Sequence, residues 1–396
     1  MKLKMTSAIV GVIASAIALA SPAMAVSTPP PGTTGFDNLP DQILAGGSDT
    51  TYSVSNALAG LYNQSPGCTV FVTAATVGQC DTSIAQGPTT TFANWDHDLL
   101  GNAFPVGSGN GRTQLTTGSG SNPIDLGRSS SGISSVAGLS LYEFASEGIA
   151  IAAVNPAAKA RVGGASGFNI TKAQLQVIYG PSPACSTVTW ADLGDVGPNA
   201  ADVVLPFGMN SGSGTYGSFN TYIGTTANSG GCVVGQPFEN DVAELKKIDV
   251  TAVDNNLRYL TGQGIWWLSG ATASAFPVQA ATLSPMNLET FSYTDTSTYP
   301  LVRNVSYFAK NTDAQWSTTG PTGATGGKPG AVREFLRWVC KPAATHALDN
   351  TVQTQTTGRS YNLQITGAIQ KAGFNPSVLT NASTTAFGRC KGKFNP

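Results

Sequence analysis

Short segments rich in glycine and hydroxyl residues are the part of this sequence best suited to bind a ligand. Residues 213–215 (Ser-Gly-Thr) follow an apolar run at 203–205 and precede residues with helical spacing. At the start of a helix, free backbone N–H groups and the helix dipole attract an anion. Thr51 and Ser108 lie at similar turn-to-helix positions, where they would add hydroxyl donors. Together these segments predict an oxyanion site with little need for lysine or arginine.

Signals for catalysis are weak by comparison. Residues 96–98 (Asp-His-Asp) are either a metal or acid/base site or a polar loop, and the loop is favoured because further metal ligands are not apparent. The sequence contains no Gly-x-Ser-x-Gly nucleophile segment. Residues 212–217 match the Gly-x-Gly-x-x-Gly dinucleotide pattern, but the acidic residue expected further on is not evident. We therefore expect neither enzyme activity nor a cofactor or metal.

The composition excludes several classes of protein. Of the 396 residues, 41% are hydrophobic and only 11% are charged, and the net charge is −1. Disordered chains combine low hydrophobicity with high net charge, so this chain should fold. Binding to nucleic acid needs a basic excess that is missing here. The 36 serines and 45 threonines must instead supply much of the polar surface.

The N-terminal residues predict export. Lys2 and Lys4 precede an apolar stretch at 8–20, and Ala-Met-Ala at 23–25 forms a cleavage site, so residues 1–25 are expected to be a signal peptide. The apolar stretch is shorter than the roughly 20 residues of a membrane span, and no later segment is long and apolar enough. Residues 26–41 are expected to form a Pro-rich leader. We expect a secreted or periplasmic monomer.

An even number of cysteines in an exported chain favours disulfides over a zinc site. No Cys-x-x-Cys pair occurs, and neither of the two histidines has ligand spacing to a cysteine. Fifteen pairings are possible for six cysteines. We expect neighbours in sequence to pair, which gives Cys68–Cys80, Cys185–Cys232 and Cys340–Cys390.

Helical and strand patterns alternate along the chain, which favours an α/β fold. Apolar spacing and end signals predict helices that start near Thr51, at the capping box 171–174, and at the stripe 332–339; another covers 363–372, before Gly373. Continuous apolar runs predict buried strands at 149–154 and 203–205.

In this order, the segments resemble the phosphate-binding subunits of bacterial ABC importers, which are type II periplasmic binding proteins, and in particular their secreted actinobacterial branch. Residues 47–52 (Gly-Ser-Asp-Thr-Thr-Tyr) are similar to the first phosphate loop of that family, and 107–109 are similar to the second. Residues 124–130 resemble the strand and loop before the third contact, and 213–215 match the family's Ser-Gly-Thr loop. Residues 170–190 look like the segment that opens its second lobe.

The resemblance implies two α/β lobes with mixed sheets flanked by helices and two crossover strands. Residues 42–155 with 300–396 would form lobe I, and 156–299 would form lobe II. Phosphate or a related oxyanion would bind in the cleft between them for delivery to an ABC permease. The implied ligand contacts are Thr51, Tyr52, Ser108, Arg128, Ser129, Ser130, Ser213, Gly214 and Thr215.

Two positions depart from the family pattern. Met209 stands where the family has an arginine, and Ser130 stands where it has the aspartate that accepts the proton of hydrogen phosphate. Arg128 or Arg112 could supply the missing charge. Two alternatives therefore stay open: a secreted surface or adhesive protein with a degenerate cleft, and a phosphatase-like enzyme that uses residues 96–98.

Overall fold

The computed structural model describes residues 42–63, 81–84, 105, 107–117, 124–132, 136–154, 169–180, 188–194, 200–201, 203–227, 233, 264–271, 283–310, 327–340, 361–379 and 390. The signal peptide, the Pro-rich leader and residues 96–98 lie outside these residues and stay predictions. The same holds for four of the cysteines, Cys68, Cys80, Cys185 and Cys232.

The described residues form a mixed α/β fold, which confirms the expected fold class. The helices are α1 (Tyr52–Asn63), α2 (Ser108–Thr117), α4 (Lys172–Tyr179), α5 (Gly214–Ile223), α8 (Gly327–Cys340) and α10 (Tyr361–Lys371). The strands are β1 (Gln42–Gly47), β2 (Asp81–Ile84), β3 (Leu126–Ser129), β4 (Leu139–Val154), β5 (Asn169–Ile170), β6 (Leu205–Pro206), β7 (Gly264–Ser269), β8 (Leu283–Leu288) and β9 (Val302–Lys310). Two single turns of 3₁₀ helix cover Ala191–Leu193 and Pro376–Val378.

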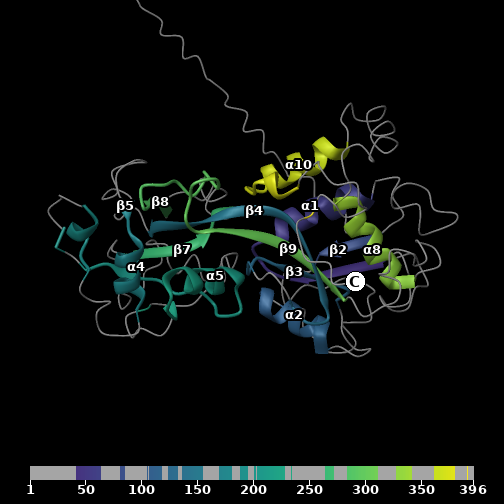
Figure 1. Cartoon of the computed structure of the whole chain (residues 1–396), viewed down its shortest axis with the longest axis horizontal. Helices are drawn as coiled ribbons and strands as arrows, with labels where there is room; N and C mark the ends of the chain where they lie inside the picture. Colours follow the sequence, from purple (N-terminus) through teal and green to yellow (C-terminus); the bar gives the residue numbers. More distant parts are fainter. Residues whose placement is uncertain are drawn as a thin grey trace, which may run out of the picture.

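One sheet connects the whole structure, and its central strands are the longest. Its order is β2-β1-β3-β9-β4-β7-β6, with β8 also paired to β4 and β5 paired to β8. Strand β1 runs parallel to β2 and β3, whereas β9 is antiparallel to both β3 and β4. In Figure 1, β4 and β9 run from the half of the molecule that contains α4 and α5 into the half that contains α1, α2, α8 and α10.

The buried apolar residues form two main cores, one in each half. One core consists of residues between 149 and 301, and it includes Trp190, Phe219 and Trp267. Almost all of the other core comes from 43–145 and 305–390. Because β4 contributes to both cores, it ties the two halves together. The assignment of these halves to lobes that move relative to each other stays a prediction.

The sequence patterns account for most of the helices. Thr171 accepts from the Gln174 backbone N–H and Gln174 bonds back to the Thr171 N–H, which is the expected capping box at the start of α4. Helix α10 ends shortly before Gly373, whose φ of 86° suits a residue without a side chain. All described helices fall short of the length or the apolar character needed to cross a membrane.

Two strands differ from their predicted bounds. The predicted strand at 149–154 is the end of β4, which begins ten residues earlier, at Leu139. Its first part contains polar residues, including Glu147, which forms an ion pair with Arg303, a residue far away in the sequence. The strand predicted at 203–205 begins two residues later, as β6.

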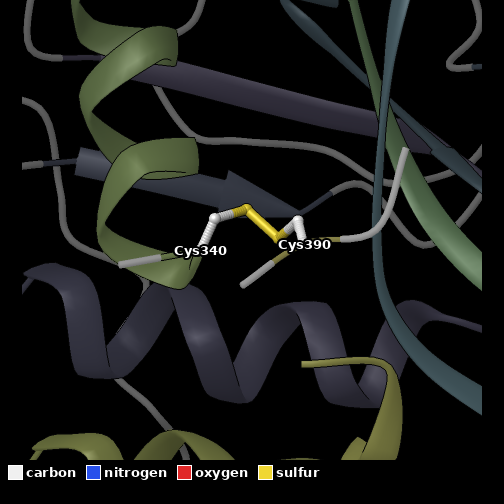
Figure 2. Close-up of a disulfide and its surroundings, with 2 residues drawn as sticks. All are labelled: Cys340 and Cys390. Atoms are coloured by element: carbon white, nitrogen blue, oxygen red, sulfur yellow. A yellow bond between two sulfur atoms is a disulfide. The ribbon is translucent and has the colours of Figure 1, made fainter. Parts of the chain in front are cut away.

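A disulfide joins Cys340, the last residue of α8, to Cys390 (Figure 2). Both cysteines are buried in the core that also contains Leu58 and Tyr62 of α1. This bond is one of the three expected pairs. It attaches the end of the chain to the half of the molecule that contains α1 and α8.

Replacing Cys340 and Cys390 by serine should lower the free energy of unfolding by about 2–4 kcal/mol. The bond closes a loop with a sequence separation of 50, and opening it gives the unfolded chain more conformational freedom. Urea denaturation of the variant and the wild type measures the difference. An unchanged midpoint would contradict the expectation.

Candidate functional site

Four loops meet where β1 and β3 end and where α1, α2 and α5 begin. The Ser48 N–H donates to the Arg128 carbonyl (2.9 Å), and the Gly107 N–H donates to the Gly47 carbonyl (3.0 Å). A Cβ atom on Gly107 would overlap the Gly212 carbonyl oxygen, so the loop before α2 touches the loop before α5. The carboxyl ends of parallel strands are a common place for ligands in α/β folds.

Three serine hydroxyls from three of these loops form a buried cluster. Ser130 Oγ lies 2.8 Å from Ser48 Oγ and 3.4 Å from Ser108 Oγ. The Ser130 N–H also donates to Ser108 Oγ (2.9 Å). Each of the three residues is at most 1% exposed. The structure therefore brings together Ser108 and Ser130, which were predicted, with Ser48, which lies in the predicted first loop.

The first turn of α5 packs directly on this cluster. Ser213 caps the helix, because its Oγ accepts from the Thr215 N–H at 3.1 Å. Thr215 Oγ1 lies 3.5 Å from Thr50 Oγ1 of the first loop. A Cβ atom on Gly214 would lie 2.6 Å from both Ser108 Oγ and Ser130 Oγ. Only glycine allows the helix to approach this closely.

Arg128, on β3 two residues before Ser130, is a buried positive charge. It is 1% exposed, and its guanidinium carbon lies 5.7 Å from the centre of the Tyr52 ring. Burial lowers the pKa of Arg128 to about 10, so the side chain is still protonated at pH 7. The predicted residues Tyr52 and Arg128 are thus neighbours. Met209 is buried in the core between 149 and 301, whereas Arg112 is half-buried on α2 and its part in the site stays a prediction.

Two of the predicted contacts are turned toward their own loops. Ser129 Oγ lies 3.0 Å from Ser131 Oγ. Thr51 Oγ1 donates to the Ser48 carbonyl at 3.3 Å. The ligand-binding role of all nine predicted residues stays a prediction.

Asp49 belongs to the site but was not among the predicted contacts. It lies between Ser48 and Thr50 and is 2% exposed, and neither of its carboxylate oxygens has a hydrogen-bond partner among the described residues. Burial raises the pKa of the Asp49 carboxyl, although nearby backbone amides and the charges of Arg128 and Arg303 oppose this effect. Its position inside the Gly-Ser-Asp-Thr-Thr-Tyr loop was the available signal.

Arg303 connects this site to the centre of the sheet. Its Nε and Nη2 donate to Glu147 Oε1 at 2.9 and 2.6 Å, and both residues are at most 4% exposed. The third nitrogen, Nη1, has no hydrogen-bond partner among the described residues. Glu147 Oε2 in turn accepts from Ser269 Oγ and from the Ala271 N–H. β4 and β9 therefore carry a buried ion pair whose arginine also acts on Asp49.

Asp49→Asn should stabilise the ligand-free protein at neutral and alkaline pH. Because the pKa is raised in the folded state, the wild type is most stable below the ordinary pKa of 3.8 and loses stability as the pH rises through the folded pKa. One unit between the two pKa values corresponds to about 1.4 kcal/mol. In thermal melts from about pH 4 to pH 9, the melting temperature of the variant should increase relative to that of the wild type as the pH rises. A difference that does not vary with pH would contradict the expectation.

Where the structure describes the chain, no group of three or more His, Cys, Asp or Glu side chains is placed to hold a metal ion. The chemistry that the described site offers is therefore that of hydroxyls, backbone amides, two arginines and one carboxyl group. Such donors bind and orient an oxygen-rich ligand.

No protein-family model matches the sequence, and no curated protein matches it. The structure is similar to an ABC-type phosphate transport receptor from Vibrio cholerae, with a TM-score of 0.47 and 15% identity over 84% of this chain and 99% of the other. It is similar to a phosphate-binding protein from Stenotrophomonas maltophilia, with a TM-score of 0.46 and 13% identity over 86% and 91%.

The similarity extends to a protein of a different kind. The CcmR regulatory domain from Synechocystis, solved in complex with 2-PG, has a TM-score of 0.37 and 12% identity over 69% of this chain and 88% of that domain. All these TM-scores are below 0.5, and all the identities are below 25%. At these levels the similarity carries no information about the ligand of this chain.

Proposed function

We propose that this chain is an extracytoplasmic solute-binding protein that captures phosphate or a related oxyanion. The observation that carries the proposal is the buried cluster of Ser48, Ser108 and Ser130 at the N-terminus of α5. Three hydroxyls from separate loops at one helix end form a compact set of donors, and Arg128 lies beside them.

The physical basis is the match between these donors and an anion. The first N–H groups of a helix have no partner inside the helix and carry the positive end of its dipole. Hydroxyl groups rotate to donate, and in a buried site such hydrogen bonds are stronger than in water. Arg128 is buried and protonated, so it supplies charge that the hydroxyls lack.

The proposed role includes export and a partner. The expected signal peptide would direct the chain to the periplasm or the medium, as in the secreted actinobacterial branch that it resembles. There it would bind as a monomer and deliver its ligand to an ABC permease. Release would follow from separation of α5 from the loops of the other half.

Isothermal titration calorimetry of the purified protein with phosphate and with sulfate tests the proposal. We expect saturable binding with a dissociation constant in the micromolar range or tighter. An absence of binding of either anion at millimolar concentration would overturn the proposal and leave the surface-protein alternative.

Two helix-capping residues offer a matched pair of variants. Ser213 caps α5 in the site, and Thr171 caps α4. Replacing either by alanine should cost about 1 kcal/mol of stability. Only Ser213→Ala should weaken oxyanion binding, by roughly tenfold, which is the equivalent of one charge-assisted hydrogen bond. Equal affinities in the two variants would argue against a ligand at α5.

A further inference from the structure

A cavity of about 410 Å³ lies where the two halves of the molecule meet, and none of the nine predicted oxyanion contacts lines it. One wall is residues 146–148 of β4, where the strand passes from one core to the other. The other walls come from the loop 293–296 before β9 and from 370–376, at the end of α10. In Figure 1, α10 lies above β4, whereas α2 and α5, which begin at the serine cluster, lie below it. The volume is within the size range of small-molecule pockets.

Hydrogen bonds between these segments hold the walls in place. Ser146 and Asn375 exchange two backbone bonds, at 2.9 and 2.7 Å. Asn375 Nδ2 also donates to Thr296 Oγ1 at 2.6 Å. A Cβ atom on Gly270 would lie 3.0 Å from ring atom Cδ2 of Tyr293, so this ring packs closely on the end of β7. The cavity is therefore a pre-formed feature of the fold and not a gap left by loose packing.

The cavity has no charge available for a ligand. Glu147 is the one charged residue among the lining residues that the structure describes. Its Oε1 accepts from two nitrogens of Arg303, and its Oε2 accepts from the Ser269 hydroxyl and the Ala271 N–H. A carboxylate has about four acceptor positions, so none is left for a cation. An ionised ligand would enter without a counter-charge, which is costly away from water.

Neutral polar groups and aromatic rings make up much of the lining. They are the hydroxyls of Thr294 and Thr296, the carboxamides of Gln370 and Asn375, and the rings of Tyr293 and Phe374. Hydroxyls and carboxamides both donate and accept hydrogen bonds. Aromatic rings offer a large apolar surface. A sugar ring has the matching chemistry, because its hydroxyl edge donates and accepts and its C–H face is apolar.

We propose that this cavity is a second binding site and that it takes a neutral sugar ring, either a free sugar or the end unit of a glycan chain. The C–H face of the sugar contacts the ring of Tyr293, and its hydroxyl groups form hydrogen bonds with Gln370 and Thr296. The inference goes beyond the proposed function, because an oxyanion and a sugar would bind through different residues.

Saturation-transfer NMR and calorimetry with glucose, mannose, galactose and N-acetylglucosamine test the inference. We expect at least one of these sugars to bind saturably, and equally well with and without phosphate. Methyl glycosides of the same sugars distinguish the two sources. A methyl glycoside that binds as well as the sugar indicates the end unit of a chain, and loss of binding on methylation indicates a free sugar.

Two variants locate the sugar, and a third is the matched control. Gln370→Ala removes a carboxamide from the exposed side of α10 and should weaken sugar binding roughly tenfold, the equivalent of one hydrogen bond. Tyr293→Leu keeps an apolar side chain but removes the ring, and it should weaken binding at least as much. Gln364→Ala makes the same change on α10 outside the cavity lining and should keep the wild-type affinity. Thermal melts check that each variant is folded.

The outcomes separate this inference from the proposed function. The inference is overturned if none of the four sugars binds at millimolar concentration, or if phosphate displaces the sugar. It is also overturned if Gln370→Ala and Tyr293→Leu bind sugar as well as Gln364→Ala does. Phosphate binding without sugar binding would leave the proposed function intact, whereas sugar binding without oxyanion binding would support the cavity and overturn the proposed function.

Discussion

Gly214→Ala is expected to reduce oxyanion affinity by at least 100-fold while the protein stays folded. The added Cβ would lie 2.6 Å from the carbonyl carbon of Ser130 and from the hydroxyl oxygens of Ser108 and Ser130. A side chain cannot occupy that space, so the start of α5 must move away from the serine cluster. The helix dipole and the first N–H groups then no longer point at the ligand. Calorimetry with phosphate measures the loss.

Gly217 provides the control on the same helix. A Cβ on Gly217 has no heavy atom within 4 Å, apart from its own helix and chain neighbours. Gly217→Ala should therefore leave affinity unchanged and stabilise the helix by up to about 1 kcal/mol. If Gly214→Ala binds phosphate as well as Gly217→Ala does, the first turn of α5 is not part of the binding site.

Glu147→Gln is expected to lower the free energy of unfolding by about 3–5 kcal/mol, because it leaves Arg303 as a buried charge without its counterion. The two residues are at most 4% exposed, so water cannot replace the lost carboxylate. The shift of the urea midpoint at constant slope measures the effect.

Two further variants test whether the loss of stability comes from the buried charge or from packing. Glu143→Gln, on the same strand, keeps an oxygen for the Asn304 side chain and should change stability by less than about 1 kcal/mol. Replacing Glu147 and Arg303 together by leucine and methionine should recover much of the loss, because neither charge of this pair is then buried. If the double variant loses as much stability as Glu147→Leu and Arg303→Met lose in sum, packing and not charge explains the effect.

Local sequence signals predicted the parts of the fold that depend on local interactions. The capping box at Thr171 and the stop signal at Gly373 are confirmed, because helix ends are determined by residues close in sequence. The first half of β4 was missed for the opposite reason. Glu147 looks unsuitable for a buried strand until Arg303, 156 residues away, is placed beside it.

The candidate site likewise combines predictable and unpredictable parts. Its loops could be predicted from their glycines and hydroxyl residues. The place where they meet could not, because it depends on strand order and on the close approach that Gly214 allows. Asp49 was overlooked because an aspartate in a polar loop is usually exposed. Only the packing of Arg128 and α5 around this loop shows that the carboxyl group is buried.

The contact between α5 and the serine cluster also has a kinetic consequence. Ser48, Ser108 and Ser130 are at most 1% exposed, and Gly214 packs on two of them, so an anion held there has no direct exit. Entry and departure must wait until α5 moves back from the other loops. We expect exchange of bound phosphate to be limited by that motion rather than by diffusion, and its lifetime in the protein to depend on how often the two halves separate.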